Sequence, residues 1–425
     1  MKFRSLAPEA KTIKTLTFLP PQETHLSGGI PLIASPKRDL GVVKLVFYWP
    51  TGTAAQSIPM QARASQTLRL SGNKSHSSEQ IQEGFEYLGA SANPDVGLLS
   101  STLVLQTQKQ YLEEALKWLV EEGAEPVFPE HELAVFKQVE TSSLQRRMQT
   151  PRYWSSRLCY ESIYGKSSPD SSFADSENIE ALTGEALGWW HTKHLSFSAC
   201  RIFVSGDFGQ DEHAVLERVM GSMAATRTTV QERIAATPAP PTQIQHPMEH
   251  AQQVSLYMGK ALPKLRVEDL QTASFVNMFL GGFFGSRLMQ DLRETRGLTY
   301  GIGSGLAQAS SGFTWYISGE MNSANAEAAV EACKTIMTGL STSPPTGDEL
   351  EKARRYASGQ LRAGFDGPFS LPSKWQFLLQ NDLPKNYHTT YMNRIWSITS
   401  DEISEFAYNY LQPGSFSLAL AGKLN

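Results

Sequence analysis

The sequence predicts an α+β protein of two similar halves, each an antiparallel-rich sheet with helices packed on one face, joined by a long linker into a clam-shell. Three observations predict this fold. The chain has 425 residues, more than one hydrophobic core usually supports. The order of predicted strands and helices in the first half recurs in the second. Between the halves the composition shifts to Thr, Ala, Pro and Gln, which is typical of a linker. We therefore expect domains at residues 1–226 and 248–425, with the linker at residues 227–247.

The overall composition narrows the class of function. Apolar residues make up 40% of the chain and charged residues 19%, as in an ordinary soluble globular protein. The net charge of −4 gives no electrostatic reason to expect nucleic acid or an anionic membrane surface as partner. The three cysteines lie far apart with no Cys-x-x-Cys pair, so free buried thiols are expected. No signal peptide and no long apolar run are recognised, so we expect a cytoplasmic protein; a leader that had been removed would leave no trace.

The first half is expected to begin with two short strands about a Gly28–Gly29 turn. Residues 42–49, VVKLVFYW, are a strong β run. Apolar residues also occupy some of the alternate positions that would otherwise be polar, and we interpret this pattern as a strand of a sheet covered on one face. Ser77 and Gln80 form a capping box that starts a helix ending at Gly89. The other elements predicted here are helices at residues 59–70, 111–122, 130–147 and 184–194 and strands at residues 98–106 and 199–206.

The second half repeats this order, and its most informative stretch is residues 281–300, GGFFGSRLMQDLRETRGLTY. This stretch predicts a Gly-rich turn, an amphipathic helix, a Gly stop and the start of a strand. Leu288 and Leu292 lie four residues apart on one helical face. Gly297 stands where a left-handed C-terminal cap is expected. The remaining predicted elements are helices at residues 268–280, 324–340 and 349–361 and strands at residues 254–258, 313–318 and 415–422.

Arg293 and Tyr300 are the candidate functional residues of this stretch. Arg293 leaves the helix at the edge of its buried face, and Tyr300 begins the following strand, so both side chains can reach one site. The Gly-Gly, Ser-Arg-Leu, Leu-Arg-Glu, Arg-Gly-Leu and Tyr elements, in this order, resemble the second-half signature of the pitrilysin/insulinase family of zinc peptidases, in its mitochondrial-processing-peptidase-like branch. The resemblance extends over nearly the whole chain. It implies that Arg293 and Tyr300 bind the substrate backbone and stabilise the oxyanion opposite the zinc.

The same resemblance implies two further substrate-binding positions. Gly282 belongs to the matching stretch of the second half. Asn93 matches a family position on the edge strand along which the peptide lies in catalytic halves. Pro94 follows it and weakens that edge as a hydrogen-bond donor.

Catalytic members of the family carry His-x-x-Glu-His on the first helix of the N-terminal half, and a distal Glu completes the zinc site. The resemblance places this motif on Arg63, Gln66 and Thr67, and the distal position near residues 143–144, where only Glu140 is close. A guanidinium does not give up its proton to bind a cation, and an amide cannot act as a base. We therefore expect degenerate motif positions and no metal in this chain, with zinc held by a partner subunit.

A second His-x-x-Glu-His pattern is formed by His246, Glu249 and His250, with Glu327 at a family-like distance. Pro247 suits only the first turn of a helix, and the segment lies between the linker and a strand with no length for a helix. A working zinc site is therefore disfavoured at this position.

Two other pairs have structural interpretations. His191 and His194 have the spacing of a metal clamp but no evident third ligand, so solvent-facing histidines at a helix end are favoured. The aromatic pairs Trp189–Trp190 and Phe283–Phe284 are interpreted as core residues.

Three hypotheses about function follow. The first is a non-catalytic subunit of a heteromeric zinc metallopeptidase, a heterodimeric processing peptidase. In it a homologous zinc-bearing subunit supplies the metal, and this chain supplies Arg293 and Tyr300 in trans to a peptide substrate. The second is a non-enzymatic peptide-binding or scaffold member of the same family. The third is an autonomous metallopeptidase that uses His246, Glu249 and His250. The sequence does not indicate which peptide is the substrate.

Overall fold

The structure is a computed structural model of the chain, and it describes residues 14–15, 18, 20–37, 39–226 and 237–424. Two sheets form its centre, one in each half, as the sequence predicts. The part of the predicted linker at residues 227–236 lies outside the described residues. The predicted linker extends too far at its C-terminal end, because residues 243–247 form a strand of the C-terminal sheet.

The N-terminal sheet has six strands in the order β1-β2-β6-β3-β5-β4. Its strands are β1 (Gln22–His25), β2 (Pro31–Pro36), β3 (Val42–Trp49), β4 (Ser91–Val96), β5 (Ser101–Gln108) and β6 (Arg201–Gly206). Strands β2 and β6 pair in parallel, and all other neighbours in this sheet pair antiparallel.

The C-terminal sheet has five strands in the order β7-β11-β8-β10-β9. Its strands are β7 (Gln243–Pro247), β8 (Val254–Pro263), β9 (Thr299–Ala309), β10 (Gly312–Met321) and β11 (Ser417–Gly422). Here too a single parallel pair, β7 with β11, stands beside antiparallel neighbours. The two sheets therefore share one plan, which confirms the repeat in the order of elements.

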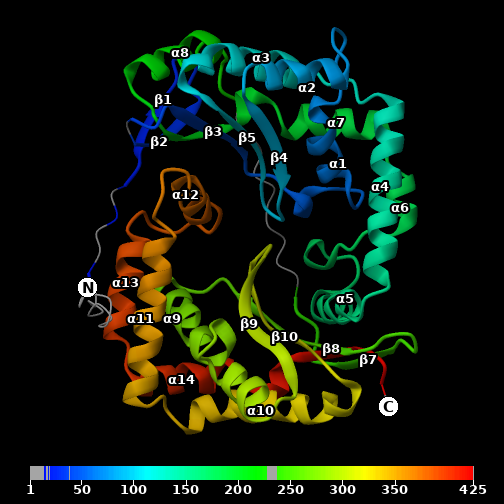
Figure 1. The fold of residues 1–425 in the computed structure, drawn as a ribbon, viewed down its shortest axis with the longest axis vertical. Helices are drawn as coiled ribbons and strands as arrows, with labels where there is room; N and C mark the ends of the chain where they lie inside the picture. Colours follow the sequence, from blue (N-terminus) through cyan, green and yellow to red (C-terminus); the bar gives the residue numbers. More distant parts are fainter. Residues whose placement is uncertain (1–13, 16–17, 19, 38, 227–236, 425) are drawn as a thin grey trace, which may run out of the picture.

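Helices pack on the outer side of each sheet, and Figure 1 shows α3 and α8 above the N-terminal sheet and α10 and α14 below the C-terminal one. The helices of the first half are α1 (Gln61–Thr67), α2 (Ser78–Tyr87), α3 (Leu112–Ala124), α4 (Glu130–Met148), α5 (Pro151–Tyr164), α6 (Ser176–Glu180), α7 (Gly184–His194) and α8 (Gln210–Met220). Those of the second half are α9 (Val267–Asn277), α10 (Ala326–Thr342), α11 (Gly347–Ala363), α12 (Leu371–Gln380), α13 (Tyr387–Ser397) and α14 (Ser400–Tyr410), with π-helical turns η7 (Met278–Gly282) and η8 (Met289–Thr295). None of the described helices is long and apolar enough to cross a membrane.

Local sequence signals explain several of these boundaries. The capping box predicted at Ser77 is present, since the Gln80 amide donates to the Ser77 hydroxyl and the Ser77 amide donates to the Gln80 side chain. Gly297 has a φ of 61°, the left-handed conformation expected after the helix. The cysteines are free and buried, as predicted.

Helix α5 belongs to the first half in sequence but packs on the C-terminal sheet. Its buried Cys159 and Ile163 lie against β8 and β11. The Tyr164 hydroxyl lies 2.6 Å from the Thr314 hydroxyl of β10. At Gly259 of β8 the helix approaches so closely that a Cβ atom would lie 2.9 Å from Ile163 Cδ1. The C-terminal sheet is thus completed by a helix from the other half (Figure 1).

Helix α12 makes the reciprocal exchange, because it belongs to the second half and packs on β6 of the N-terminal sheet. Trp375 of α12 lies in one core cluster with Val46, Tyr48 and Phe203 of that sheet. Its indole nitrogen donates to the Ser35 hydroxyl at 3.1 Å. Strand β3 is therefore buried on both faces at this end, which accounts for its filled alternation better than the one covered face expected from the sequence.

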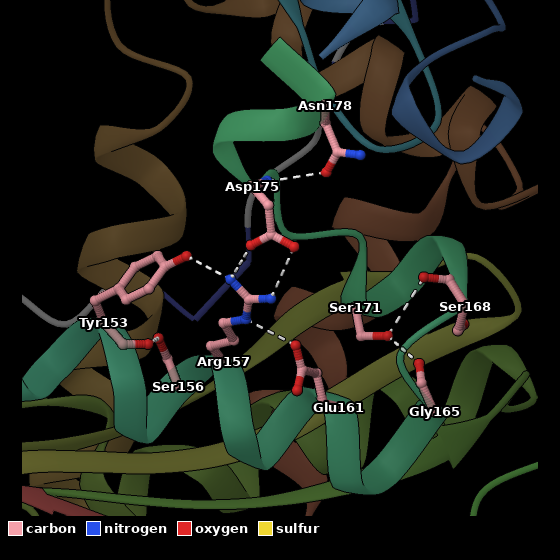
Figure 2. Close-up of polar contacts among 9 residues, drawn as sticks. All are labelled: Tyr153, Ser156, Arg157, Glu161, Gly165, Ser168, Ser171, Asp175 and Asn178. Carbon is pink, nitrogen blue, oxygen red and sulfur yellow. Dashed lines mark hydrogen bonds and ion pairs between the residues drawn. The ribbon is translucent and has the colours of Figure 1, made fainter. Parts of the chain in front are cut away.

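A polar network ties the segment after α5 to that helix (Figure 2). Arg157 donates to Glu161 at 2.7 Å, to Asp175 at 2.8 Å and to the Tyr153 hydroxyl at 2.9 Å. Asp175 also begins α6 as its N-terminal cap, through a bond from its own amide to Asn178. One guanidinium thus links α5 to the start of α6.

A buried basic cluster lies in the N-terminal core. Arg69 is fully buried, its Nε donates to the Gly123 carbonyl at 2.8 Å, and its guanidinium stacks on Trp49 and Phe197. His191 lies beside it, and burial together with the positive charge of Arg69 lowers the pKa of His191 to about 3. The expectation that His191 and His194 face solvent is wrong, since only 5% and 7% of their surfaces are exposed.

The interlock of α5 with the C-terminal sheet leads to a test at Gly259. Gly259→Val should destabilise the protein by about 1–3 kcal/mol, because its added methyl groups have no space beside buried Ile163 and Cys159. Gly301→Val is the matched control in the same sheet, since no atom lies within 4 Å of a Cβ at that position. Urea unfolding midpoints measure the difference. Equal midpoints for the two variants would show that α5 does not pack as described.

The neutral His191 makes stability depend on pH. Its pKa is depressed in the folded state, so its contribution is fully present above pH 6.5 and is lost as the pH falls toward 3. Between pH 7.5 and 5 the wild type should lose about 2 kcal/mol through this group, whereas His191→Gln does not titrate. The stability gap between wild type and variant should therefore narrow at pH 5 in urea unfolding. A gap that is constant with pH would contradict the burial of a neutral imidazole.

Candidate functional site

In the N-terminal half, the candidate metal-motif positions lie on helix α1. The structure places Arg63 of this helix opposite Glu140 of α4. The guanidinium Nη2 of Arg63 lies 3.1 Å from Glu140 Oε1, and the Glu140 side chain is only 10% exposed. The carboxylate nearest to the expected distal ligand position is therefore paired with a cation of the protein itself. A metal ion at this position would have to displace the guanidinium.

The other two motif positions do not offer metal chemistry either. Gln66 is fully buried, and its amide nitrogen donates to the Thr102 carbonyl of β5 at 2.7 Å. Thr67 is exposed at the end of α1, one turn from Arg63. Gln66 thus holds the helix on the sheet, and the donor set of α1 does not fit a zinc ion. Across the described ranges no three His, Cys, Asp or Glu side chains come close enough together to hold a metal.

The second His-x-x-Glu-His pattern does not form a site. His246 lies in strand β7, and its ring stacks on Trp154 with 4.5 Å between centroids. Glu249 and His250 lie in the turn that follows, and both are exposed. Because the segment is a strand and a turn, the two imidazoles do not share a helical face. The hypothesis of an autonomous peptidase built on these residues is therefore not supported by the geometry.

In the second half, the helix that carries Arg293 is widened into a π-helix. It begins as an α-helix and becomes π-helical at η8, Met289–Thr295. The Arg296 amide donates to the Asp291 carbonyl at 2.9 Å, a bond across five residues. Leu288 and Leu292 are fully buried, as the predicted amphipathic face requires. Short π-helical turns are frequent at functional sites.

Tyr300 lies on an irregularity of strand β9. The pairing of β9 with β10 passes from Gly301 opposite Glu320 to Thr299 opposite Met321, so Tyr300 has no partner in the register. The Thr299 hydroxyl bonds the carbonyls of Gly301 and Glu320 around it. Bulges of this kind redirect a side chain. The result is a tyrosine with 86% of its surface exposed.

The structure brings Arg293 and Tyr300 together, as the sequence predicts, and adds Phe284. The guanidinium carbon of Arg293 lies 5.0 Å from the ring centroid of Tyr300 and 5.0 Å from that of Phe284. Its ion pair at 3.4 Å is with the adjacent, exposed Glu294. Two aromatic faces therefore position the guanidinium without using its hydrogen-bond donors. Phe284 is 56% exposed, so its interpretation as a core residue is wrong.

Gly281 and Gly282 have a packing role that the sequence did not show. A Cβ on Gly281 would lie 2.5 Å from the Ser304 amide of β9, and one on Gly282 would lie 3.0 Å from the Asn277 carbonyl. The Asn277 side chain in turn bonds Ser304 and the indole of Trp315. The glycines allow η7 to lie close to β9, which places the turn containing Phe284 beside Tyr300.

Asn93 lies on β4, the edge strand of the N-terminal sheet, in the other half of the molecule from Arg293 and Tyr300. Its side chain is exposed and bonds the Ser91 hydroxyl at 3.3 Å. Pro94 faces Leu103 of β5. The position on an edge strand is as expected, and the role in peptide binding stays a prediction.

Comparison with known proteins adds the family context. Residues 181–356 match the family model described as the peptidase M16 inactive domain. This part of the chain is therefore similar to the M16 peptidase family. It is 20% identical over 357 residues to a non-peptidase homologue, YmxG, of Helicobacter pylori, covering 80% of this chain and 82% of that one. It is 28% identical over 137 residues to an uncharacterised zinc protease of Mycobacterium leprae, covering 31% of this chain and 30% of that one. A Rickettsia felis zinc protease, also uncharacterised, is 22% identical over 246 residues, 56% of this chain and 57% of its own length.

Two solved structures share the fold over nearly the whole chain. The chain superposes on a structure titled as a peptidase M16 inactive domain from Pseudomonas fluorescens with a TM-score of 0.86 and 22% identity, covering 96% of this chain and 99% of that one. A structure titled as a protease from Helicobacter pylori gives a TM-score of 0.85 and 14% identity, with coverage of 95% and 100%. At these identities the likeness to the two solved structures shows a shared fold.

The contact between Arg63 and Glu140 suggests a test of the degenerate zinc motif on α1. The test restores the two histidines of the motif. In Arg63→His/Thr67→His, two imidazoles one turn apart would stand beside the freed Glu140 carboxylate, the ligand set that zinc accepts. We expect the double variant to bind one zinc per chain by isothermal titration calorimetry, and the wild type to bind none here. Adding Glu140→Gln should abolish the binding. Zinc binding by the wild type that survives Glu140→Gln, or none by the double variant, would contradict this placement.

Proposed function

We propose that this chain is the non-catalytic subunit of a heteromeric zinc metallopeptidase of the mitochondrial-processing-peptidase-like branch. In this proposal a homologous subunit with an intact His-x-x-Glu-His carries the zinc. This chain contributes Arg293 and Tyr300 to the peptide substrate in trans. One observation carries the proposal: an arginine is held between two exposed rings while the α1 positions of the same chain lack every metal ligand.

The exposure of the cluster formed by Arg293, Tyr300 and Phe284 is the main physical support for the proposal. A large aromatic side chain that is 86% exposed gains little from burial, and the bulge that turns it outward gives up strand pairing. A pure scaffold has no use for both the exposed phenol and the stacked guanidinium. A site that awaits a ligand needs both to be accessible.

The roles follow from the chemistry of the two groups. The partner's zinc would polarise the scissile carbonyl and the attacking water. The Tyr300 hydroxyl would donate a hydrogen bond to the developing oxyanion. The Arg293 guanidinium would donate charge-assisted bonds to a neighbouring substrate carbonyl and so fix the register of the peptide.

A non-enzymatic peptide-binding or scaffold role is the second candidate. It is favoured by the Helicobacter pylori relative, which is named a non-peptidase homologue and is covered over 82% of its length. The two candidates differ in one respect, since only the first requires a zinc-bearing partner.

The test is to co-express the chain with a homologue that has His-x-x-Glu-His and to follow peptide cleavage. Tyr300→Phe should lower kcat about 10²-fold, because the loss of one oxyanion donor costs on the order of 3 kcal/mol of barrier. Arg293→Ala should lower kcat/KM with much of the loss in KM.

Tyr408→Phe and Arg355→Ala are matched controls at an exposed tyrosine of α14 and an exposed arginine of α11, and they should leave the rate unchanged. Full activity of both site variants would overturn the roles of Arg293 and Tyr300. Absence of cleavage with every zinc-bearing homologue would favour the scaffold candidate.

A further inference from the structure

A pocket of about 190 Å³ lies beside the start of α5, on the face of the C-terminal sheet that this helix only partly covers. It is lined by Arg152 of α5, Ser255 of β8, three residues of β9 and three residues of β10: Gly301, Ile302, Gly303, Ser318, Gly319 and Glu320. Gly301 directly follows Tyr300 in the chain. The pocket therefore joins a residue of the first half to the strand that carries the candidate site.

The register of the sheet explains how the floor of the pocket is built. Ser255, Glu320 and Gly301 stand in one row across β8, β10 and β9. Ser318 and Gly303 stand opposite each other two positions along, on the same face. Apart from Glu320, these side chains are small or absent. Helix α5 closes one side, where the Ser155 hydroxyl lies 2.9 Å from the Ser255 hydroxyl. The floor is thus a shallow, nearly flat strip of β-sheet.

Gly301 is a glycine that its own surroundings do not require. A Cβ there would meet no atom within 4 Å, and its φ lies outside the left-handed region. Gly305 on the same strand differs, because a Cβ at that position would lie 2.7 Å from the Tyr316 hydroxyl. A strand glycine costs about 0.5–1 kcal/mol relative to alanine, and it often marks a bulge, such as the one at Tyr300, or the close approach of a ligand or another backbone.

The two charged residues of the pocket do not neutralise each other. Arg152 is exposed and Glu320 is half-buried, and neither makes an ion pair with any described residue. Arg157, one turn further along α5, is instead held by two carboxylates. A guanidinium and a carboxylate at one strip of sheet offer donors for a carbonyl and an acceptor for an N–H group, which is the pattern of an extended peptide.

We propose that this pocket binds an extended peptide segment, laid over Gly301 and Gly303, with Arg152 donating to a carbonyl of the segment and Glu320 accepting from an N–H group. The proposal deepens the proposed function and rests on it for the identity of the peptide as substrate. Arg152 is a peptide-binding residue supplied by the first half. Because Gly301 follows Tyr300, a segment bound here would lead along β9 to the phenol.

The test measures peptide binding to the purified full chain, so it needs no partner subunit. The probe is a fluorescein-labelled pool of proline-free decapeptides, followed by fluorescence anisotropy. The wild type should bind saturably. Gly301→Val should abolish binding while the fold is kept, because the valine occupies open space above the strip. Arg152→Ala should weaken binding about tenfold or more, as expected for a lost charge-assisted contact. Arg355→Ala on α11 is the matched control and should bind as the wild type does.

Absence of saturable binding by the wild type would overturn the proposal, and so would wild-type affinity in Gly301→Val. Unchanged thermal unfolding of each variant shows that a loss of binding is not a loss of fold. A chain that binds peptides through this pocket but supports no cleavage with any partner would retain this inference and refute the peptidase complex. Cleavage that depends on Tyr300 but is insensitive to Gly301→Val would support the peptidase complex and refute this inference.

Discussion

The exchange of helices between the two halves is the constraint on which the rest of the structure depends. Helix α5 completes the C-terminal sheet, and α12 completes the N-terminal one. Each brings apolar side chains to a sheet formed by the other half, as Ile163 and Trp375 show. Neither sheet is fully covered by its own segment of sequence. The halves are therefore joined by a shared core in addition to the linker, which sets their relative placement.

This exchange also determines what each half can present. Because α5 crosses to the C-terminal sheet, Arg152 stands beside Gly301 and Glu320 although these residues lie about 150 positions away along the chain. Gly301 lies on strand β9, directly after Tyr300. The candidate site is thus composite even within one chain. A change that loosens α5 should affect both the stability of the C-terminal sheet and the pocket.

Features encoded by neighbouring residues could be predicted from the sequence, and features set by distant partners could not. The capping box at Ser77, the left-handed Gly297 and the buried face of Leu288 and Leu292 are local, and the structure confirms them. The pairing of Arg293 with Tyr300 was also within reach, because a single turn separates their elements. Helices α5 and α12 have apolar faces that are matched to strands of the other half, and the sequence analysis did not predict them. It also did not predict α8, α13 and α14, which pack within their own halves.

Three errors at single residues come from tertiary contacts. His191 lies near a helix end, where a histidine is usually solvated, but the packing of buried Arg69 and Gly123 around it is not visible in the sequence. Phe284 looked like half of a core pair, yet it is outside the core and stacks on Arg293. Trp189 was likewise interpreted as a core residue, but it is 51% exposed. In each case tertiary contacts overrode a local signal.

The first half keeps its architecture for reasons independent of metal. Gln66 anchors α1 to β5 through the Thr102 carbonyl, and Arg63 satisfies the partly buried carboxylate of Glu140. An uncompensated carboxylate at that depth would be costly, so the guanidinium serves as the cation there. The second half instead keeps a solvent-facing cluster that its own fold does not need. The asymmetry between the halves is the physical basis for the proposal that this chain acts beside a zinc-bearing partner.

The most direct test of this account is the zinc-to-chain ratio of the material that copurifies with the protein from its source cells. The tagged full chain would be purified with its partners, and metal and chains would be quantified by mass spectrometry. The account predicts one zinc for each pair of chains, with the metal leaving together with a homologous subunit that contains His-x-x-Glu-His. Zinc that stays in equal amount with this chain after the partner is removed would contradict it.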